Sequence, residues 1–310
     1  MLIRPKTAIL IPQRGVWTAM FAALLITLPS VHAVVETPTK KIVFIAGNPS
    51  HPPGEHEHRA GCMLLAKQLN ESGLPLHAVV TAHGWPEDHS IFTGAAAVII
   101  YADGGTSHPA LNHLDDLKKL ANDGVGIGCI HYAVEIPIGV PGDTLRDLIG
   151  GYFETNWSVN PHWQGSFKVP KHQVTQGIHD FKITDEWYYH LRFTPEMAGI
   201  TPILTALPPP ATLSRPDGAH EGNPAVRLAV LDRKESQHVM WVHERPQKLG
   251  GGRAFGFTGG HFHKNWQQDD HRRVVLNAIA WISGLQVPEK GVASKTPSNA
   301  AMAENLDDKK

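Results

Sequence analysis

Between residues 41 and 149 the chain alternates short apolar runs with segments of helical periodicity, and this alternation limits the fold more than any other feature. Short apolar runs closed by glycine or turn residues are typical of buried strands. Strands that alternate with helices predict a parallel sheet covered by helices on both faces. The predicted strands are Lys41–Gly47, Leu76–Thr81, Ala95–Ala102 and Val125–Ile130, and the predicted helices are His56–Ser72, Pro109–Asn122 and Asp143–Ile149.

The alternation weakens in the C-terminal half and then returns. A β-rich excursion is expected across Gly151–Val242, and strand Arg253–Thr258 followed by helix Asp269–Ser283 restores the first pattern. The short runs of the excursion are Gly165–Val169, Thr201–Leu207, Ala225–Leu231 and His238–His243. We therefore expect one doubly wound α/β domain over residues 34–288, with a mainly parallel sheet. Residues 289–310 lack aromatic residues and apolar periodicity, which predicts a disordered tail.

The first thirty-three residues have the composition of a secretory signal. Three basic residues and no acid lie in a leader that contains the apolar stretch Val16–Leu28, and Val31-His32-Ala33 resembles a signal-peptidase site. A bilayer-spanning helix needs about 20 apolar residues, so a cleaved signal is favoured over a single-span anchor. We expect an exported protein, periplasmic or secreted, with no membrane association after cleavage.

The net charge limits the classes of partner that the protein can bind. The formal net charge is −1, and removal of three basic residues and no acid would make it −4. Neither value provides the basic surface that nucleic acids require, and no basic amphipathic helix indicates a membrane surface. We expect a small neutral or polar substrate and no nucleic-acid partner. The sequence does not indicate an oligomeric state.

Twenty histidines are the most unusual feature of the composition, and several follow predicted strands directly. The sequence Glu55-His56-Glu57-His58 follows the first strand, His131 follows the fourth, and His261-Phe262-His263 follows the last, while Pro161-His162-Trp163 lies in the excursion. Ligands of open α/β sheets bind beyond the carboxyl ends of the strands. Because imidazole is the commonest metal ligand, these histidines predict one polar, metal-binding site at that edge.

Helix and strand periodicity suggests which of these histidines would meet. His58 continues the apolar face of the predicted helix and would point over the sheet edge, so it is the better ligand candidate; His56 is assigned to capping or support. His261 and His263 would share one face of an extended backbone. The alternatives are a solvated, acid-rich first helical turn and buried histidines bonded to carbonyls. The candidate metal ligands are His58, His131, His261 and His263, and zinc, manganese and iron remain open.

Carboxylates and aromatic residues near these histidines suggest a sugar-binding site. The sequence Asp185-Glu186-Trp187-Tyr188-Tyr189-His190 combines acids with aromatic faces, which suits stacking on a sugar ring and bonding to its hydroxyls. The alternative is a strand whose aromatic residues belong to the core. Candidate substrate-binding residues are Asp103, His162, Trp163, Glu186, Trp187, Tyr188 and Trp266. Glu135, four residues after His131, could form a base–acid pair with it on a helical turn.

The combined pattern resembles the ThuA-like family, named for trehalose utilisation, from Lys41 to about Val287. The motifs that carry the resemblance are EHEH at 55–58, GVGIGCIHYAVE at 124–135, GGYF at 150–153, NPHW at 160–163, DEWYYH at 185–190 and GFTGGHFHKNW at 256–266. The resemblance implies a flavodoxin-like fold of the class I glutamine-amidotransferase-like superfamily and a role in carbohydrate metabolism. It also implies substrates oxidised to ketones at a ring carbon. We expect no nucleotide cofactor.

From this resemblance we expect metal-assisted isomerisation or cleavage of a keto-glycoside, with Glu135 or Asp185 moving the proton. The alternative is a non-catalytic carbohydrate-binding protein on the same fold. Glutamine amidotransferase activity is not expected, because Cys129 has Ile127 and His131 where the G-x-C-x-G nucleophile elbow has glycines. Both cysteines, Cys62 and Cys129, are expected to be buried free thiols.

Overall fold

A seven-stranded sheet forms the centre of the fold, in the order β2-β1-β3-β4-β11-β10-β9. The computed structural model describes residues 1–2, 7–8 and 38–309, so the predicted signal peptide lies almost entirely outside the described residues. The strands of the sheet are β1 Lys40–Ala46, β2 Leu76–Thr81, β3 Ala95–Tyr101, β4 Gly126–Ile130, β9 Ile200–Ala206, β10 Gln237–Glu244 and β11 Arg253–Phe257. Strands β2, β1, β3, β4 and β11 pair in parallel, and only the β11–β10 and β10–β9 pairs are antiparallel.

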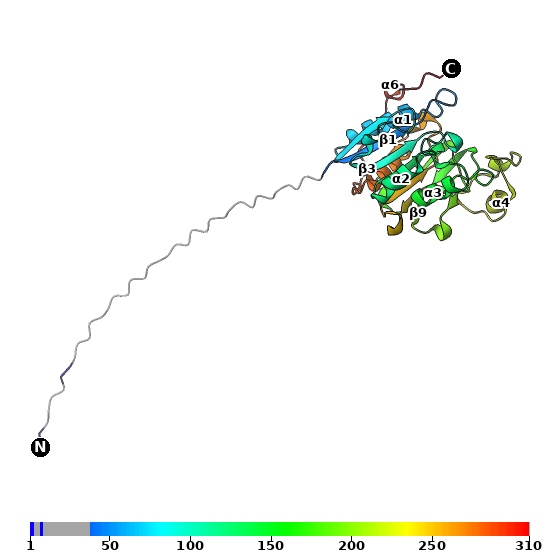
Figure 1. The fold of residues 1–310 in the computed structure, drawn as a ribbon. Helices are drawn as coiled ribbons and strands as arrows, with labels where there is room; N and C mark the ends of the chain where they lie inside the picture. Colours follow the sequence, from blue (N-terminus) through cyan, green and yellow to red (C-terminus); the bar gives the residue numbers. More distant parts are fainter. Residues whose placement is uncertain (3–6, 9–37, 310) are drawn as a thin grey trace. The chain divides into compact units, whose positions relative to one another are not determined.

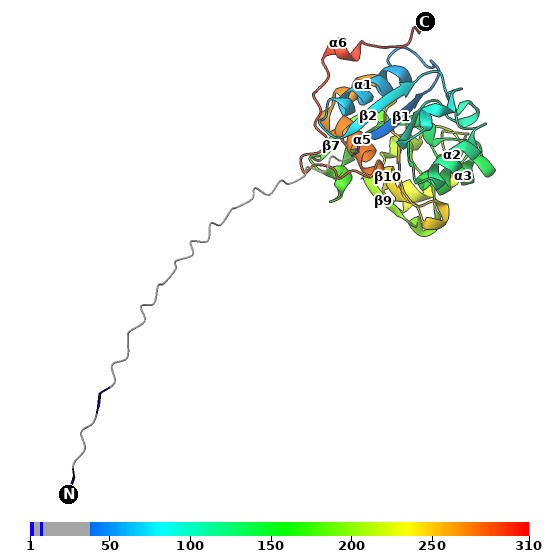
Figure 2. The ribbon, with the colours of Figure 1, turned by 60° about the vertical axis from the view of Figure 1, so that its left-hand side comes forward.

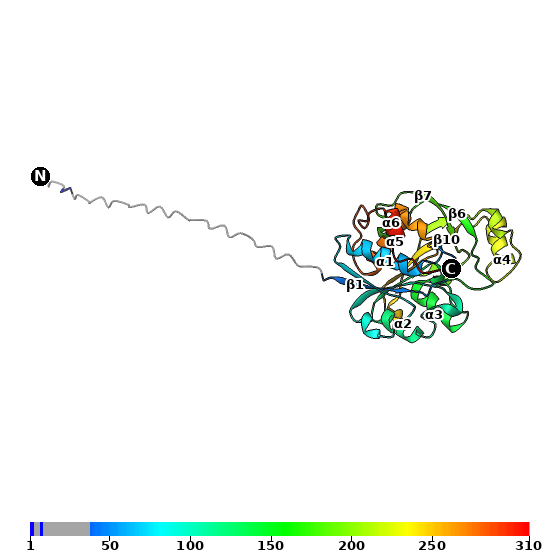
Figure 3. The ribbon, with the colours of Figure 1, turned by 90° about the horizontal axis from the view of Figure 1, so that it is seen from above.

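Helices cover both faces of this sheet, which confirms the doubly wound, flavodoxin-like fold. Figure 3 shows α1 and α5 on one face and α2 and α3 on the other. Alternate residues of β1 point to the two faces: Ile42 and Phe44 belong to one buried cluster, and Val43 and Ile45 belong to the other. The helices are α1 His58–Asn70, α2 Leu114–Asn122, α3 Val140–Ile149, α4 Pro224–Arg227, α5 Asp269–Ile282 and α6 Asn299–Met302.

The predicted β-rich excursion is present. Figure 1 shows it in green and yellow, from β5 to β10. Besides β9 and β10 it contains two small antiparallel pairs, β5 Gly151–Tyr152 with β8 Arg192–Phe193 and β6 His162–Phe167 with β7 Phe181–Glu186. The predicted strand Ala225–Leu231 is wrong, because this segment is α4 followed by the π-helical turn η7 Leu228–Asp232. Asn223 caps the helix through the Val226 N–H and Pro224 occupies its first turn, which are local signals for a helix start.

Short 3₁₀ turns connect the main elements. They are η1 His89–Phe92, η2 Gly105–Ser107, η3 His131–Val134, η4 Gln173–Thr175, η5 Pro195–Met197, η6 Pro210–Leu213, η8 Gln247–Leu249 and η9 His263–Gln267. The expectation of two buried free thiols is confirmed for Cys62 and Cys129. In the part of the chain that the structure describes, no helix has the length and apolar character required to cross a membrane.

The expectation of a disordered tail is wrong for residues 289–309, which we name the strap. Figure 2 shows the strap in red, with α6 lying beside α1. Its polar groups are bonded to the domain: the Lys295 N–H donates to Gln68, and Asp307 forms an ion pair with Arg59 of α1. Composition suggested disorder because the strap has few apolar residues, but two of them, Val292 and Met302, pack into the buried core and these polar bonds hold the rest.

Candidate functional site

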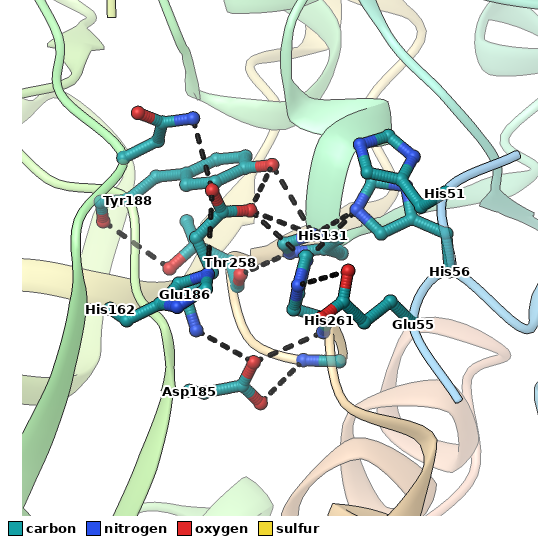
Figure 4. A network of polar contacts seen from close by, with 12 residues as sticks. His51, Glu55, His56, His131, His162, Asp185, Glu186, Tyr188, Thr258 and His261 are labelled. Carbon is teal, nitrogen blue, oxygen red and sulfur yellow. Dashed lines mark hydrogen bonds and ion pairs between the residues drawn. The ribbon is translucent and has the colours of Figure 1, made fainter. Parts of the chain in front are cut away.

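Four loops meet at the carboxyl edge of the sheet. Strand β1 lies next to β3, and the chain leaves β1 for α1 on one face and β3 for α2 on the other, as Figure 3 shows, so the two loops diverge at a topological switch point of the sheet. Strand β11 pairs in parallel with β4, which brings the loop after β11 to the same edge. The convergence expected from the sequence therefore occurs, and Figure 4 shows the side chains that meet there.

Three histidines and one carboxylate form the centre of this site, which we name the inner cluster. His56 Nε2 lies 3.0 Å from His261 Nδ1 and 3.0 Å from His131 Nε2. Glu186 Oε2 lies 3.2 Å from His261 Nδ1 and 3.4 Å from His131 Nε2. One atom from each of these four residues lies within 4.8 Å of every other, and the three imidazoles are buried.

The outer nitrogens of two of these rings are hydrogen-bonded to groups that can only accept. His56 Nδ1 lies 2.8 Å from Asp103 Oδ1, and His131 Nδ1 lies 2.8 Å from the Thr258 carbonyl oxygen. In the neutral rings Nδ1 must therefore carry the hydrogen, and both Nε2 atoms present lone pairs to each other. The Tyr188 hydroxyl, 3.2 Å from His131 Nε2, supplies one donor, and His261 supplies at most one more.

The inner cluster thus has more lone pairs than hydrogens to share among them. A divalent transition metal fits this donor set, because metal-binding histidines typically donate their second N–H to a carboxylate or a backbone carbonyl. The three imidazoles and Glu186 would hold the ion. The set of nitrogen and oxygen donors suits zinc, manganese or iron alike.

The electrostatics of Glu186 and His261 depend on their mutual contact. Burial disfavours the charged carboxylate, but the contacts with the imidazoles of His131 and His261 outweigh this and lower the pKa of Glu186 well below its usual range. Burial also opposes a charge on His261, and the contact with Glu186 outweighs it, so the pKa of His261 is raised. An ionised Glu186 is the form that would bind a cation.

Asp185 supports the site from below and does not face the inner cluster. It is fully buried and accepts hydrogen bonds from the N–H groups of Gly260 at 2.9 Å and His261 at 3.1 Å. It also accepts from the Asn265 side chain at 2.9 Å and from the Glu186 N–H at 2.8 Å. With its oxygens occupied in this way, Asp185 holds the loop after β11 in place, whereas the sequence suggested a proton-transfer group.

The structure reverses the roles predicted for His56 and His58. His56 lies in the inner cluster, while His58 is the first residue of α1, with Nδ1 3.2 Å from the Asn48 carbonyl oxygen. His58 Nε2 lies 3.7 Å from Asp103 Oδ1, outside the inner cluster, and burial lowers the pKa of His58 to about 4. The helical-face argument does not apply to His56, because this residue precedes the helix with φ 47° and its ring turns inward.

The sequence His261-Phe262-His263 is not an extended chelating pair. The backbone turns at this point: Phe262 forms an isolated bridge with Glu55, and His263 begins η9. His263 Nε2 lies 3.1 Å from the carbonyl oxygen of Met302, so only His261 reaches the inner cluster. Phe262, between the two histidines, is only partly buried.

Glu135 pairs with a histidine that the sequence gave no reason to select. Its carboxylate lies 2.9 and 3.1 Å from His220 Nε2, across 85 residues of chain. The hydrogen bond with Glu135 raises the pKa of His220, whose side chain is 28% exposed. The expected pairing of Glu135 with His131 does not form, because His131 has φ 58° and starts a 3₁₀ turn. No local signal marks His220; only the fold brings it to Glu135.

A cavity of about 680 Å³ lies next to the inner cluster and shares Glu186 with it. His162, Asn160 and Arg215 line it, and the Asn160 side-chain N–H donates to Glu186 Oε1 at 3.1 Å. The full lining is Asn160, Pro161, His162, Trp163, Gln164, Glu186, Pro209, Ala211, Thr212 and Arg215.

The predicted aromatic wall is wrong for most of its members. Trp187 and Trp266 are fully buried in the core beneath the site, and Trp163 is 5% exposed at the cavity. Tyr188 is also buried, but its hydroxyl reaches His131. Asp103 is partly exposed, and its shortest side-chain contact is with His56, so it orients that ring.

These observations define a class: α/β proteins with a doubly wound sheet whose edge loops enclose a buried histidine–carboxylate cluster. The family model described as "ThuA: Trehalose utilisation" matches residues 54–282, and the chain belongs to this family. The match begins at Gly54, within the loop that carries His56, and ends at the last residue of α5.

Solved structures share the fold at low sequence identity. A ThuA-like protein from Bacteroides uniformis has a TM-score of 0.54 and 16% identity, with 83% of this chain and 95% of that chain covered. A ThuA-like protein from Parabacteroides merdae has a TM-score of 0.51 and 13% identity, with 85% and 94% covered. A glutamine amidotransferase from Thermotoga maritima has a TM-score of 0.45 and 6% identity, with 80% and 99% covered. No curated protein matches the chain in sequence.

Proposed function

We propose that this protein is a metal-dependent enzyme that isomerises or cleaves a glycoside oxidised to a ketone at a ring carbon. The observation that carries the proposal is the inner cluster, in which the outer nitrogens of His56 and His131 are held by acceptors while their inner nitrogens face each other. Membership of a family described by trehalose utilisation supports a sugar-derived substrate. The adjacent cavity, which shares Glu186, is large enough for a small sugar.

Residues of the chain would bind the sugar and move its proton. When bound, a divalent metal would supply a Lewis acid for the ketone oxygen. Asn160 fixes Glu186, and His162 and Arg215 offer hydrogen bonds to sugar hydroxyls in the cavity. We assign the proton transfer to the Glu135–His220 pair, whose imidazole is partly exposed.

The reaction itself needs only a proton transfer. His220 would take a proton from the carbon next to the ketone, leaving an enolate. Where that carbon carries a hydroxyl, the hydroxyl proton passes to the enolate oxygen and the proton on His220 returns to the former carbonyl carbon, which gives the isomeric ketone. Departure of the glycosidic oxygen from the adjoining carbon, protonated as it leaves, gives cleavage. Neither route requires an oxidant, a reductant or a nucleotide cofactor.

Elemental analysis of the purified protein tests the metal part of this proposal. We expect close to one equivalent of a transition metal, lost in His56→Ala and His131→Ala and retained in the matched control His58→Ala. His58 is equally buried but lies outside the inner cluster. A metal-free protein whose stability ignores added zinc or manganese would contradict the proposal.

Turnover of a keto-glycoside tests the catalytic part and separates it from the alternative, a carbohydrate-binding protein. We expect His220→Gln to lower kcat by about 10²-fold or more while the sugar still binds, because general acid–base groups contribute roughly that factor. Binding of the sugar without turnover in the metal-loaded wild-type protein would favour the binding protein.

We also propose that the protein is exported, on the strength of the basic leader and apolar stretch within residues 1–33. N-terminal sequencing of the protein from its native host tests this. A mature chain that begins at Val34 supports export, and an intact Met1 contradicts it.

A further inference from the structure

We propose that the strap is a clasp for the metal-binding loops: Lys309 holds the Glu55–His58 turn in the position that brings His56 to His261. The proposal concerns the position of the loops, and only its metal readout depends on the proposed function. It assigns a role to a segment whose composition gave no indication of one.

The ammonium group of Lys309 is buried inside the turn that carries His56. It donates to the carbonyl oxygens of Glu55 and, at 3.2 Å, of His56, and it forms an ion pair with Glu57 Oε1 at 3.3 Å. The side chains of Lys309 and Glu57 are 4% and 1% exposed. A single cation therefore bonds to three consecutive residues, and the middle one belongs to the inner cluster.

Glu57 extends this bonding to both sides. Its Oε1 accepts from the Gly54 N–H at 2.9 Å, and its Oε2 accepts from the Asp307 N–H at 3.0 Å. Asp307 in turn pairs with Arg59 in the first turn of α1. The start of the helix, the turn before it and the strap are thus one connected polar network.

The strap also bonds to the loop after β11, which carries His261. The Met302 carbonyl oxygen lies 3.1 Å from His263 Nε2, and the Gln267 side chain donates to the Pro297 carbonyl oxygen at 3.2 Å. The two loops meet directly through the His56 N–H, which donates to the His261 carbonyl oxygen at 3.0 Å. The strap therefore spans both loops that must be in register for His56 Nε2 to face His261 Nδ1.

A buried ion pair is not evidence of stability in itself, because removing both charges from water is costly. What a buried pair does provide is a large penalty for any arrangement in which one partner is left alone. Here Lys309 also donates to the carbonyl oxygens of Glu55 and His56, so the buried ion pair is tied to one position of the backbone of the turn. The strap thus favours one position of the Glu55–His58 turn over others.

The test compares Lys309→Met, Glu57→Gln and the double variant with the wild-type chain, using Co²⁺ alone as the metal probe. Lys295→Met is the matched control, because Lys295 is an exposed lysine of the same strap. We expect Lys309→Met to weaken Co²⁺ binding about 10-fold or more, the usual effect of losing a residue that orients a metal ligand. Amide hydrogen exchange at His56 should become faster, and Lys295→Met should change neither quantity.

The double variant separates loop positioning from charge balance. Removing both charges should recover much of the thermal stability lost in either single variant, while Co²⁺ affinity stays low because the carbonyls of Glu55 and His56 remain without Lys309. Full recovery of Co²⁺ affinity in the double variant would overturn the clasp. So would wild-type affinity in Lys309→Met.

The same experiments distinguish failure of the proposed metal-dependent function from failure of the clasp. If the wild-type protein does not bind Co²⁺, the metal hypothesis fails and hydrogen exchange alone decides on the clasp. Faster exchange confined to the loops after β1 and β11 in Lys309→Met then supports the clasp, and unchanged exchange overturns it.

Discussion

Two residues of the inner cluster occupy a backbone conformation that side chains rarely adopt. His56 has φ 47° and His131 has φ 58°, and the neighbouring His51 has φ 61°. The left-handed region costs an L-residue about 1–2 kcal/mol. Such residues persist where the surrounding structure determines them, and they gather at functional sites. At this site the strain aims two imidazoles at a common point.

This strain predicts an unusual order of stability for substitutions at His131. Gly is normally less favourable than Ala in folded chains, but at φ 58° it avoids the strain that Ala retains. We expect His131→Gly to unfold at higher urea concentration than His131→Ala, by about 1 kcal/mol in the free energy of unfolding. Both variants lose the same imidazole bonds, so the comparison isolates the backbone. The opposite order would show that the left-handed conformation relaxes once the ring is gone.

Asp185 provides a second prediction at this scale. Asp185→Asn replaces one acceptor oxygen by an NH₂ group, which must face either the N–H of Gly260 or the N–H of His261, because these donate to different oxygens. We expect a loss of about 1–3 kcal/mol in urea unfolding, because a buried donor is left unsatisfied. Asp115→Asn, at a fully exposed position, is the control. Unchanged stability in Asp185→Asn would return Asp185 to the group of proton-transfer candidates.

At the scale of elements, the sequence predicts best what local signals determine. Strand β2 has the predicted bounds, and α5 ends within one residue of the prediction, with a glycine just past its end. Buried parallel strands are continuous apolar runs, so their signal is contained in the run itself. The strap shows the opposite case: its order depends on Glu57 and Gln68, more than 220 residues away, and no window of sequence contains both partners.

The difference between local signals and contacts distant in sequence also explains which features of the candidate site could be predicted. The sheet edge was predictable because parallel strands present their carboxyl ends together, and His131 directly follows β4 while His261 lies four residues after the end of β11. The direction of each imidazole ring was not predictable. It depends on residues with left-handed backbone conformation and on hydrogen-bond acceptors distant in sequence, such as the Thr258 carbonyl oxygen and Asp103. The contact of Glu135 with His220 crosses 85 residues, so it required the folded excursion to be seen.

For the molecule as a whole, buried neutral histidines link stability to pH. His108 is bonded on both sides, with Nε2 donating to the Ala133 carbonyl oxygen and Nδ1 accepting from the Ala110 N–H. His271 lies among the rings of Trp187, Phe257 and Trp266. Burial lowers the pKa of both histidines to about 4. The unfolded chain therefore binds more protons than the folded one between pH 4 and about 6.5.

The free energy of unfolding should consequently be at its plateau above about pH 6.5 and fall as the pH decreases toward 4. Each of the two histidines contributes a slope of up to about 1.4 kcal/mol per pH unit within that window. Urea unfolding at a series of pH values measures this. His108→Gln should lower the slope of the free energy of unfolding against pH by the contribution of one proton. His179→Gln, at an exposed position, should leave this slope unchanged. An unchanged slope in His108→Gln would show that other groups control the acid limit.

The arrangement of loops over an apolar sheet also has a consequence for engineering. The residues that face the site come from the segments after β1, β4 and β11 and from the excursion, whereas the two buried clusters that hold the helices to the sheet contain none of the inner-cluster residues. A combinatorial library restricted to His220 and to the cavity lining other than Trp163, which belongs to one of these clusters, would thus vary specificity without repacking the sheet. In this protein the frame and the chemistry are encoded at separate positions, which makes it a suitable scaffold for directed evolution.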